Sequence, residues 1–262
     1  MSKKDERLKN LISIIKNNNG ASIKELSTLL DVSEMTIRRD IKILESQNIL
    51  EIYHGSVVYN PNYDNPTISK NDSDYSLSSN SVLMEKEKSL IGKKAAELIN
   101  DDDIIIIDSG TTTEKLSQNL NENVKCTALV FTSNNFIHLL YKKNVNLIFA
   151  GGKMHRDSGI FESAEGLKLI DGVRASKLFL SAAGVHDELG LTCANGYEIE
   201  AKKTIIKNSV EVILLVDSSK FDQVKSAHFC DLDQVDTIIT DDGISDEWKK
   251  IIEDRKIKLI IA

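Results

Sequence analysis

The segment Asp108-Ser109-Gly110-Thr111-Thr112-Thr113 decides how the larger part of this 262-residue chain folds. It follows an unbroken run of isoleucines, Ile104–Ile107, and precedes a pattern of apolar residues at helical spacing. A β-branched run of this kind is typical of a strand that is buried on both faces, as in a parallel sheet. The segment therefore predicts a strand that ends at Asp108, a turn at Gly110 and a helix that begins among the threonines.

Two interpretations of this turn are open. The start of a helix directs backbone N–H groups, hydroxyls and the positive end of the helix dipole at one point, which suits a phosphate or another small anion. Alternatively, Thr111 or Thr112 only caps the helix. The other predicted strands favour the anion site, because each ends in small, polar or glycine-rich residues. These ends are Ser133-Asn134-Asn135, Gly151-Gly152-Lys153, Ala183-Gly184, Asp217-Ser218-Ser219-Lys220 and Asp241-Asp242-Gly243.

Strand and helix patterns alternate from Val82 to the end of the chain, which predicts an α/β fold with a mostly parallel sheet. The carboxyl ends of such strands share one edge of the sheet, where ligands bind. The predicted helices include 136–141 and 198–207. The predicted strands are 104–107, 127–131, 145–150, 177–182, 210–216, 237–239 and 258–261.

Composition excludes several classes of protein. The chain is 41% hydrophobic and 28% charged, has no apolar run long enough for a membrane span and begins with a polar segment, so we expect a cytoplasmic protein without membrane contact. Cys126, Cys193 and Cys230 lie far apart and away from the histidines, which predicts reduced thiols, no metal site and no cofactor. Residues 1–58 carry nine Lys/Arg against eight Asp/Glu, a balance of +1, so the rest of the chain, with 24 basic and 32 acidic residues, carries −8 of the overall net charge of −7.

The first 58 residues predict a winged helix-turn-helix domain. After one helix, Ser22 and Glu25 form a capping-box pattern that starts a second, and Ser33 is placed to cap a third. In the third helix, Ile37, Ile41 and Leu44 form an inward stripe. The opposite face holds Met35, Arg38, Arg39 and Lys42, with Thr36 beside them.

A basic outer face of this kind suits a recognition helix in the major groove, where arginine binds guanine or phosphate through two hydrogen bonds. Residues 49–58 predict two short strands that turn at Gly55, the wing. A small docking domain with a solvated charged face is the alternative. Residues 59–81 contain both prolines and many Asn, Ser and Asp, and predict a flexible linker before an effector-sensing domain at 82–262.

The string Ser33-Glu34-Met35-Thr36-Ile37-Arg38-Arg39-Asp40, followed by His54-Gly55, resembles the signature of the DeoR family of bacterial transcriptional repressors. The resemblance extends to the larger domain through Glu87-Lys88, the Asp108–Thr112 turn, Gly151-Gly152 and Asp217–Phe221. It implies a sensor similar in fold to ribose-5-phosphate isomerase. It also implies operator contacts by Ser33, Met35, Thr36, Arg38 and Arg39, to which the basic face and the wing add Lys42 and His54.

The same resemblance implies that the sensor binds a phosphorylated sugar or a related metabolite. Gly110, Thr111 and Thr112 would hold the phosphate, Asp108 would accept hydrogen bonds from sugar hydroxyls and Lys220 would supply positive charge. Lys202 would pair with Glu198 or face the ligand, and the pairing is the simpler role. The remaining expected site residues are Ser133, Asn134, Gly151, Gly152, Gly184 and Asp217.

These observations predict a repressor of a carbohydrate-use operon that works as a dimer or tetramer on double-stranded operator DNA and is relieved by the metabolite. The alternative is a sugar-phosphate isomerase with an appended DNA-binding module, with Asp108 or Asp217 as the base. A third reading is a regulator whose larger domain only oligomerises.

Overall fold

A computed structural model of the chain describes residues 3–17, 20–46, 49–53, 56–59 and 84–262. The chain divides into two compact units, an N-terminal unit, Met1–Leu83, and a C-terminal unit, Met84–Ala262. Tyr59, the first residue of the predicted linker, belongs instead to the last strand of the N-terminal unit, and the rest of that linker lies outside the described residues, as does Gly55, the predicted turn of the wing. Within the described residues, no helix combines the length and the apolar character that crossing a membrane requires.

The N-terminal unit is a helix-turn-helix with a small antiparallel sheet. Ser22 caps the second helix through the predicted capping box with Glu25, and the Oγ of Ser33 accepts a hydrogen bond from the N–H of Thr36 at 3.2 Å. The elements are α1 (Lys3–Asn17), β1 (Ala21–Ser22), α2 (Ile23–Leu29), α3 (Glu34–Ser46), β2 (Leu50–Tyr53) and β3 (Ser56–Tyr59). β2 pairs with β3 as the predicted wing, and β1 pairs with the other edge of β3.

A partly buried ion pair joins the first and third helices of this unit. Asp40 is 1% exposed and accepts hydrogen bonds from the guanidinium of Arg7 at 2.6 and 3.2 Å. The bond to Asp40 raises the pKa of Arg7 despite the opposing effect of burial. Ile37, Ile41 and Leu44 face the core beside Asp40, which leaves the opposite face of α3 free for another molecule.

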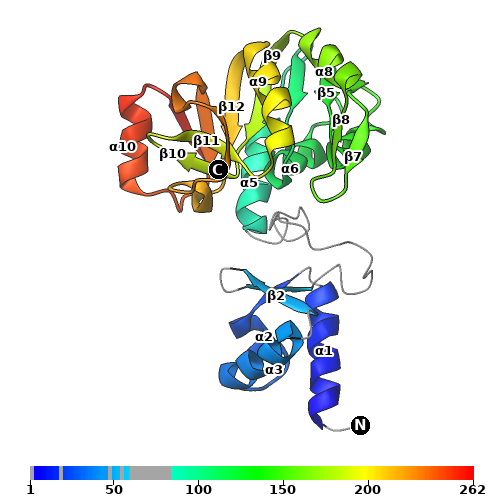
Figure 1. Ribbon diagram of the computed structural model, residues 1–262, viewed down its shortest axis with the longest axis vertical. Coiled ribbons are helices and arrows are strands. Elements are labelled where there is room, and N and C mark those ends of the chain that lie inside the picture. Colours follow the sequence, from blue (N-terminus) through cyan, green and yellow to red (C-terminus); the bar gives the residue numbers. More distant parts are fainter. Residues whose placement is uncertain (1–2, 18–19, 47–48, 54–55, 60–83) are drawn as a thin grey trace. The chain divides into compact units, whose positions relative to one another are not determined.

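The core of the C-terminal unit is a seven-stranded sheet in which every pairing is parallel (Figure 1). The strand order is β15-β14-β12-β9-β4-β5-β6. The strands are β4 (Ile104–Ile107), β5 (Cys126–Val130), β6 (Val145–Phe149), β9 (Ala175–Ser181), β12 (Ser209–Leu215), β14 (Thr237–Thr240) and β15 (Lys258–Ile261). All seven predicted strands are therefore confirmed, with ends that differ by at most two residues.

Helices cover both faces of this sheet, as expected when strands are buried on both sides. One apolar core contains side chains of α8, α9 and α10, and the other contains side chains of α5, α6 and α7. These helices are α5 (Glu85–Ala96), α6 (Thr111–Asn119), α7 (Ser133–Leu139), α8 (Ala164–Asp171), α9 (Ile199–Lys207) and α10 (Asp246–Asp254). The predicted helix 198–207 is confirmed, whereas the one predicted at 136–141 begins earlier, at Ser133.

The chain reverses its direction across the sheet between β4 and β9. From β4 it adds β5 and then β6 on one side, and it then returns to place β9 on the other side of β4. In an open α/β sheet, such a reversal leaves a crevice at the carboxyl ends of the two central strands. The predicted anion turn therefore stands at this crevice, because it follows β4 directly.

Two small sheets lie outside the predicted pattern. A hairpin of β7 (Lys153–His155) and β8 (Ile160–Glu162) follows β6. A separate antiparallel sheet joins β10 (Gly184–His186), β11 (Gly190–Cys193) and β13 (Ala227–Cys230). Their strands have three or four residues each, too few for a clear alternation of polar and apolar positions. Three short 3-10 helices, η1 (Gly196–Glu198), η2 (Ser218–Lys220) and η3 (Leu232–Gln234), complete the unit.

Candidate functional site

The outer face of α3 carries the predicted DNA-contacting side chains. Met35 is 76% exposed, Ser33, Arg38, Arg39 and Lys42 are exposed, and Thr36 is half-buried. Arg38 lies 3.8 Å from Glu34, one helical turn away, so its guanidinium is held loosely at the surface. His54, the predicted contact in the wing, lies outside the described residues.

The carboxyl ends of β4 and β9, called the crevice below, surround a fully buried carboxylate, Asp108, at the end of β4. Its Oδ2 accepts hydrogen bonds from the backbone N–H of Ser181 at 2.9 Å and from the Ser181 hydroxyl at 3.1 Å. The ammonium of Lys202 lies 2.5 Å from the same oxygen. Asp108, expected to accept bonds from a sugar, thus already holds the ends of β4 and β9 and helix α9 together.

Lys202 pairs more closely with Asp108 than with Glu198, the partner expected from helical spacing. Glu198 Oε2 lies 4.0 Å from Lys202 Nζ. Burial on its own lowers the pKa of Lys202, but the charges of Asp108 and Glu198 outweigh it and raise the pKa. Burial raises the pKa of Glu198, against the effects of Lys202 and of Asn195, which donates a hydrogen bond at 3.0 Å.

Gly110 permits the close approach of the α6 start to the end of β9. Its φ is +142°, and a Cβ on it would lie 2.9 Å from the hydroxyl oxygen of Ser181. No side chain caps the N-terminus of α6, and the hydroxyl of Thr113 donates instead to the carbonyl of Asp108 at 2.8 Å. The capping role considered for Thr111 or Thr112 is therefore not seen. The start of this nine-residue helix has no side-chain acceptor for its backbone N–H groups.

The start of α7 lies against the start of α6. Asn135 is 1% exposed and donates to the carbonyl of Asp108 at 2.9 Å, while Asn134 donates to Glu114 of α6 at 2.9 Å. Within the described residues, the hydroxyl of Ser133 makes one side-chain hydrogen bond, to the side-chain oxygen of its neighbour Asn134 at 3.3 Å. The crevice is thus walled on one side by two helix starts.

A second group of charges stands at the end of β12. Lys88, from the first turns of α5, is 1% exposed, and its Nζ lies 4.0 Å from Oδ2 of Asp217. That oxygen has no hydrogen-bond partner among the described residues. Burial lowers the pKa of Lys88 to about 8, with Asp217 opposing the shift and Lys220 and Lys115 adding to it. Lys220 is half-buried in η2, so two lysines and an incompletely paired carboxylate meet here.

The sequence did not single out Lys88, Ser181 or Asn135 as site residues. A signal for Lys88 is present, because it precedes Ile91 and Ala95 by three and seven positions and so falls on the apolar stripe of its helix. A lysine at such a position is buried, which is uncommon without a partner or a role.

The remaining predicted glycines serve different purposes. Gly152 has φ +149° and packs against the backbone of Glu162, so it allows the β7–β8 hairpin to fold back on itself. Gly184 lies in the separate sheet, where a Cβ would lie 2.4 Å from the carbonyl oxygen of Gln223. A Cβ on Gly151 would contact only the ring of Phe149, at 3.6 Å, so among these three glycines Gly151 alone leaves room for a ligand beside its backbone.

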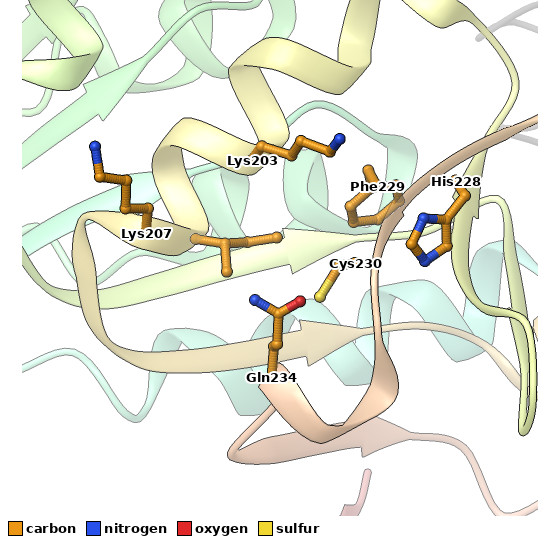
Figure 2. Close-up of a pocket in the computed structure, with 7 residues that line it drawn as sticks. Lys203, Lys207, His228, Phe229, Cys230 and Gln234 are labelled. Carbon is orange, nitrogen blue, oxygen red and sulfur yellow. The ribbon is translucent and has the colours of Figure 1, made fainter.

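A surface hollow of about 260 Å³ lies on another side of α9 (Figure 2). It is lined by the apolar Ile206 and Phe229 and by polar side chains including Lys203, Lys207 and His228. None of the predicted effector residues lines it, so this hollow is distinct from the crevice.

The structure offers no metal centre within its described residues, where no three His, Cys, Asp or Glu side chains are grouped to hold an ion. The three cysteines are buried free thiols. Burial raises the pKa of Cys126 to about 11 and those of Cys193 and Cys230 to about 12, so they are protonated and unreactive at neutral pH.

The lowered pKa of Lys88 predicts a specific pH dependence of stability. Between about pH 8 and 10.5 the unfolded chain keeps the Lys88 proton that the folded chain releases, so stability from this group rises with pH. Between pH 8 and 9, we expect the free energy of unfolding of the parent to rise by about 1 kcal/mol more than that of Lys88→Met. Urea unfolding at each pH measures both values. Lys250→Met, at an exposed position, provides the control, and a pH-independent difference for Lys88→Met would contradict the expectation.

Both units of the chain match models of known protein families. Residues 84–242 match the DeoR C terminal sensor domain and residues 7–62 match the DeoR-like helix-turn-helix domain. The chain is 30% identical to the deoxyribose operon repressor of Escherichia coli strain K12 over 99% of both chains. It is 27% identical to the HTH-type transcriptional repressor GlcR of Bacillus subtilis strain 168, over 98% of this chain and 96% of that one.

Among solved structures, ribose 5-phosphate isomerase A from Methanocaldococcus jannaschii is similar, with a TM-score of 0.40 and 18% identity over 53% of this chain and 55% of that one. The two family models together account for both units, and the similarity to named regulators covers almost the whole chain. This chain therefore belongs to the DeoR family of transcriptional regulators.

Proposed function

We propose that this regulator represses a carbohydrate-use operon and is relieved when a phosphorylated sugar or polyol binds at the carboxyl edge of the seven-stranded sheet. Relatives named as a deoxyribose operon repressor and as the repressor GlcR support the biological role. The observation that carries the proposed site is Lys88, a nearly fully buried cation at the same edge as the uncapped start of α6.

Both features lie at this edge for a topological reason. α5 and α6 each lead into or out of β4 and run antiparallel to the parallel strands, so both helices begin at the carboxyl edge. A buried ammonium and a helix N-terminus both attract a phosphate. Lys220 adds a third positive contribution, and its charge already acts on Lys88.

The proposed mechanism is a shift between two arrangements of an oligomer. In one, two α3 helices match the two half-sites of the operator, and in the other they do not. The ligand favours the second arrangement only through its difference in affinity for the two, for which about 1–3 kcal/mol is typical. The half-site spacing then determines which arrangement binds DNA.

The proposal distinguishes this protein from a sugar-phosphate isomerase. An isomerase needs a carboxylate that is free to take a proton from its substrate. Of the two candidate bases, Asp108 is bonded to Ser181 and Lys202, whereas Oδ2 of Asp217 has no hydrogen-bond partner among the described residues. The relatives named above, which are regulators, favour the regulatory role. Incubation of the purified protein with ribose 5-phosphate tests for the alternative, since formation of a ketose phosphate would support catalysis.

The effector test is a thermal-shift screen with phosphorylated pentoses, hexoses and polyols, each paired with its unphosphorylated form. We expect only phosphorylated compounds to stabilise the folded protein, by about 2.7 kcal/mol at a concentration a hundred times the dissociation constant. Lys88→Met and Lys220→Ala are expected to lose the response, and the exposed-site control Lys250→Ala to keep it.

The same compounds are then added to the complex of the protein with its promoter DNA. Release of DNA by the compounds that raise the melting temperature supports the regulatory role. Free sugars that stabilise as well as their phosphates, or a melting curve that no phosphate moves, would overturn the proposed effector class.

A further inference from the structure

The side chains around the end of β4 are largely closed off from solvent. Ser109 is 5% exposed, Thr111 is 7% exposed and Thr112 is 6% exposed. Lys202 and Glu198, on the other wall, are 1% and 7% exposed. The segments packed against these groups therefore bear on any route by which a ligand reaches them.

The β7–β8 hairpin is anchored at the carboxyl end of β5, next to β4 in the sheet (Figure 1). The N–H of Phe161 donates to the carbonyl of Phe131 at 2.8 Å, and the N–H of Ser133 donates to the carbonyl of Gly159 at 2.9 Å. Two backbone hydrogen bonds thus seat one strand of the hairpin on the start of α7.

The tip of the hairpin contacts η1, a segment that follows the separate sheet. The rings of His155 and Tyr197 stack with centroids 3.8 Å apart and planes 11° apart. The hydroxyl of Tyr197 donates to the buried hydroxyl of Ser158 at 2.8 Å, and Nε2 of His155 lies 2.6 Å from Glu162. These contacts join two segments about 40 residues apart in the sequence.

The next residue after Tyr197 touches the crevice itself. Glu198 lies 3.4 Å from the hydroxyl of Ser109, which follows β4, and 4.0 Å from the ammonium of Lys202. The hairpin, η1 and Glu198 thus form a continuous connection from the end of β5 to the end of β4. The ring stack and the hydrogen bond between the Tyr197 and Ser158 hydroxyls are contacts in this connection that involve neither strand pairing nor a buried charge.

We propose that the β7–β8 hairpin covers the effector site, that the stacked rings of His155 and Tyr197 hold it closed, and that these two residues set how fast ligands enter and leave. This inference rests on the proposed function for the identity of the site. The hairpin contact itself is a property of the ligand-free protein, so it is testable separately. A phosphorylated sugar that fits beneath the hairpin lets the ring stack re-form over it, whereas a bulkier compound prevents closure.

The first experiment measures hydrogen exchange of the ligand-free full-length protein by mass spectrometry. Tyr197→Leu removes the ring stack, Tyr197→Phe keeps the ring but loses the hydroxyl, and Tyr141→Leu makes the same change at an exposed tyrosine. We expect Tyr197→Leu to speed exchange in peptides that contain the N–H groups of Ser133 and Phe161 by about threefold to tenfold, the range that an aromatic pair implies.

Tyr197→Phe is expected to show a smaller increase, and Tyr141→Leu none. His155→Ala is expected to reproduce the effect of Tyr197→Leu, and the double variant to add little to either. Exchange at the hairpin that stays at the parent rate in both Tyr197→Leu and His155→Ala would overturn the closing contact, whatever the outcome of the effector screen.

The second experiment uses a sugar phosphate that stabilises the parent in the thermal-shift screen and follows its binding by stopped flow. Tyr197→Leu is expected to raise the association and the dissociation rate constants together. Parent-like rate constants would show that the hairpin is not on the entry route. A screen without any stabilising phosphate overturns the proposed function, while the exchange experiment still decides whether the contact closes the hairpin.

Discussion

Replacing Lys202 with methionine is expected to lower the free energy of unfolding by about 3–5 kcal/mol, the cost typical of removing one partner of a buried ion pair. Asp108 is fully buried, so without Lys202 its charge keeps, among the described residues, the donors of Ser181 and the distant hydroxyl of Ser109. Urea unfolding measures the change. Lys203→Met, at the next and exposed position of α9, is the matched control and is expected to stay within about 0.5 kcal/mol of the parent.

The double variant Asp108→Asn with Lys202→Met separates the energy of the ion pair from the cost of leaving one buried charge unpaired. Because it removes both charges, it is expected to be more stable than Lys202→Met alone. A Lys202→Met variant that unfolds like the parent would contradict the structural role of the pair. Combined with loss of ligand stabilisation, that result would place Lys202 among the ligand-binding groups.

Replacing Arg38 with alanine is expected to weaken binding to the operator by about 1–3 kcal/mol, the value of one good contact to a base. Arg38 is exposed on the outer face of α3, and its nearest carboxylate, Glu34, lies 3.8 Å away, so the side chain is available to DNA. Arg39→Ala is expected to act in the same direction. Fluorescence anisotropy with promoter DNA at several salt concentrations measures the change.

The salt dependence assigns the kind of contact that is lost. Loss of a base contact weakens binding to the operator more than to unrelated DNA, whereas loss of a phosphate contact weakens both and lowers the salt slope by about one. Arg174→Ala, an exposed arginine of the C-terminal unit, is the control. Operator affinity that is unchanged in both Arg38→Ala and Arg39→Ala would exclude this face of α3 as the reading surface.

Local patterns were sufficient to locate most of the elements. The isoleucine run predicted β4 at its observed ends, and the serine caps of α2 and α3 are formed as expected. The reason is that these features depend on neighbours in the sequence: the period of apolar positions, the start of a helix and the residue that caps it. The short strands β7, β8, β10, β11 and β13 escaped because segments of three or four residues carry too little periodicity.

The partners of buried charges required the tertiary structure. Helical spacing suggested Glu198 as the partner of Lys202, yet the closer partner is Asp108, 94 residues away. Lys88 and Asp217 are likewise distant in sequence and meet at one edge of the sheet. The spacing of residues along a helix shows only which side chains share one face of that helix. The order of strands in the sheet decides which strand ends become neighbours.

The sequence by itself determined the family, the two-part organisation of helix-turn-helix and α/β sheet, and the strand ends at which a ligand is expected. Only the tertiary structure decided that Asp108 is an internal partner of Lys202, that Lys88 lies buried beside Asp217 at the carboxyl edge, and that the β7–β8 hairpin contacts η1. The physical reason is the parallel sheet. Its strands bring chain segments together by long crossovers, so contacts at its carboxyl edge are set by strand order and burial rather than by local sequence.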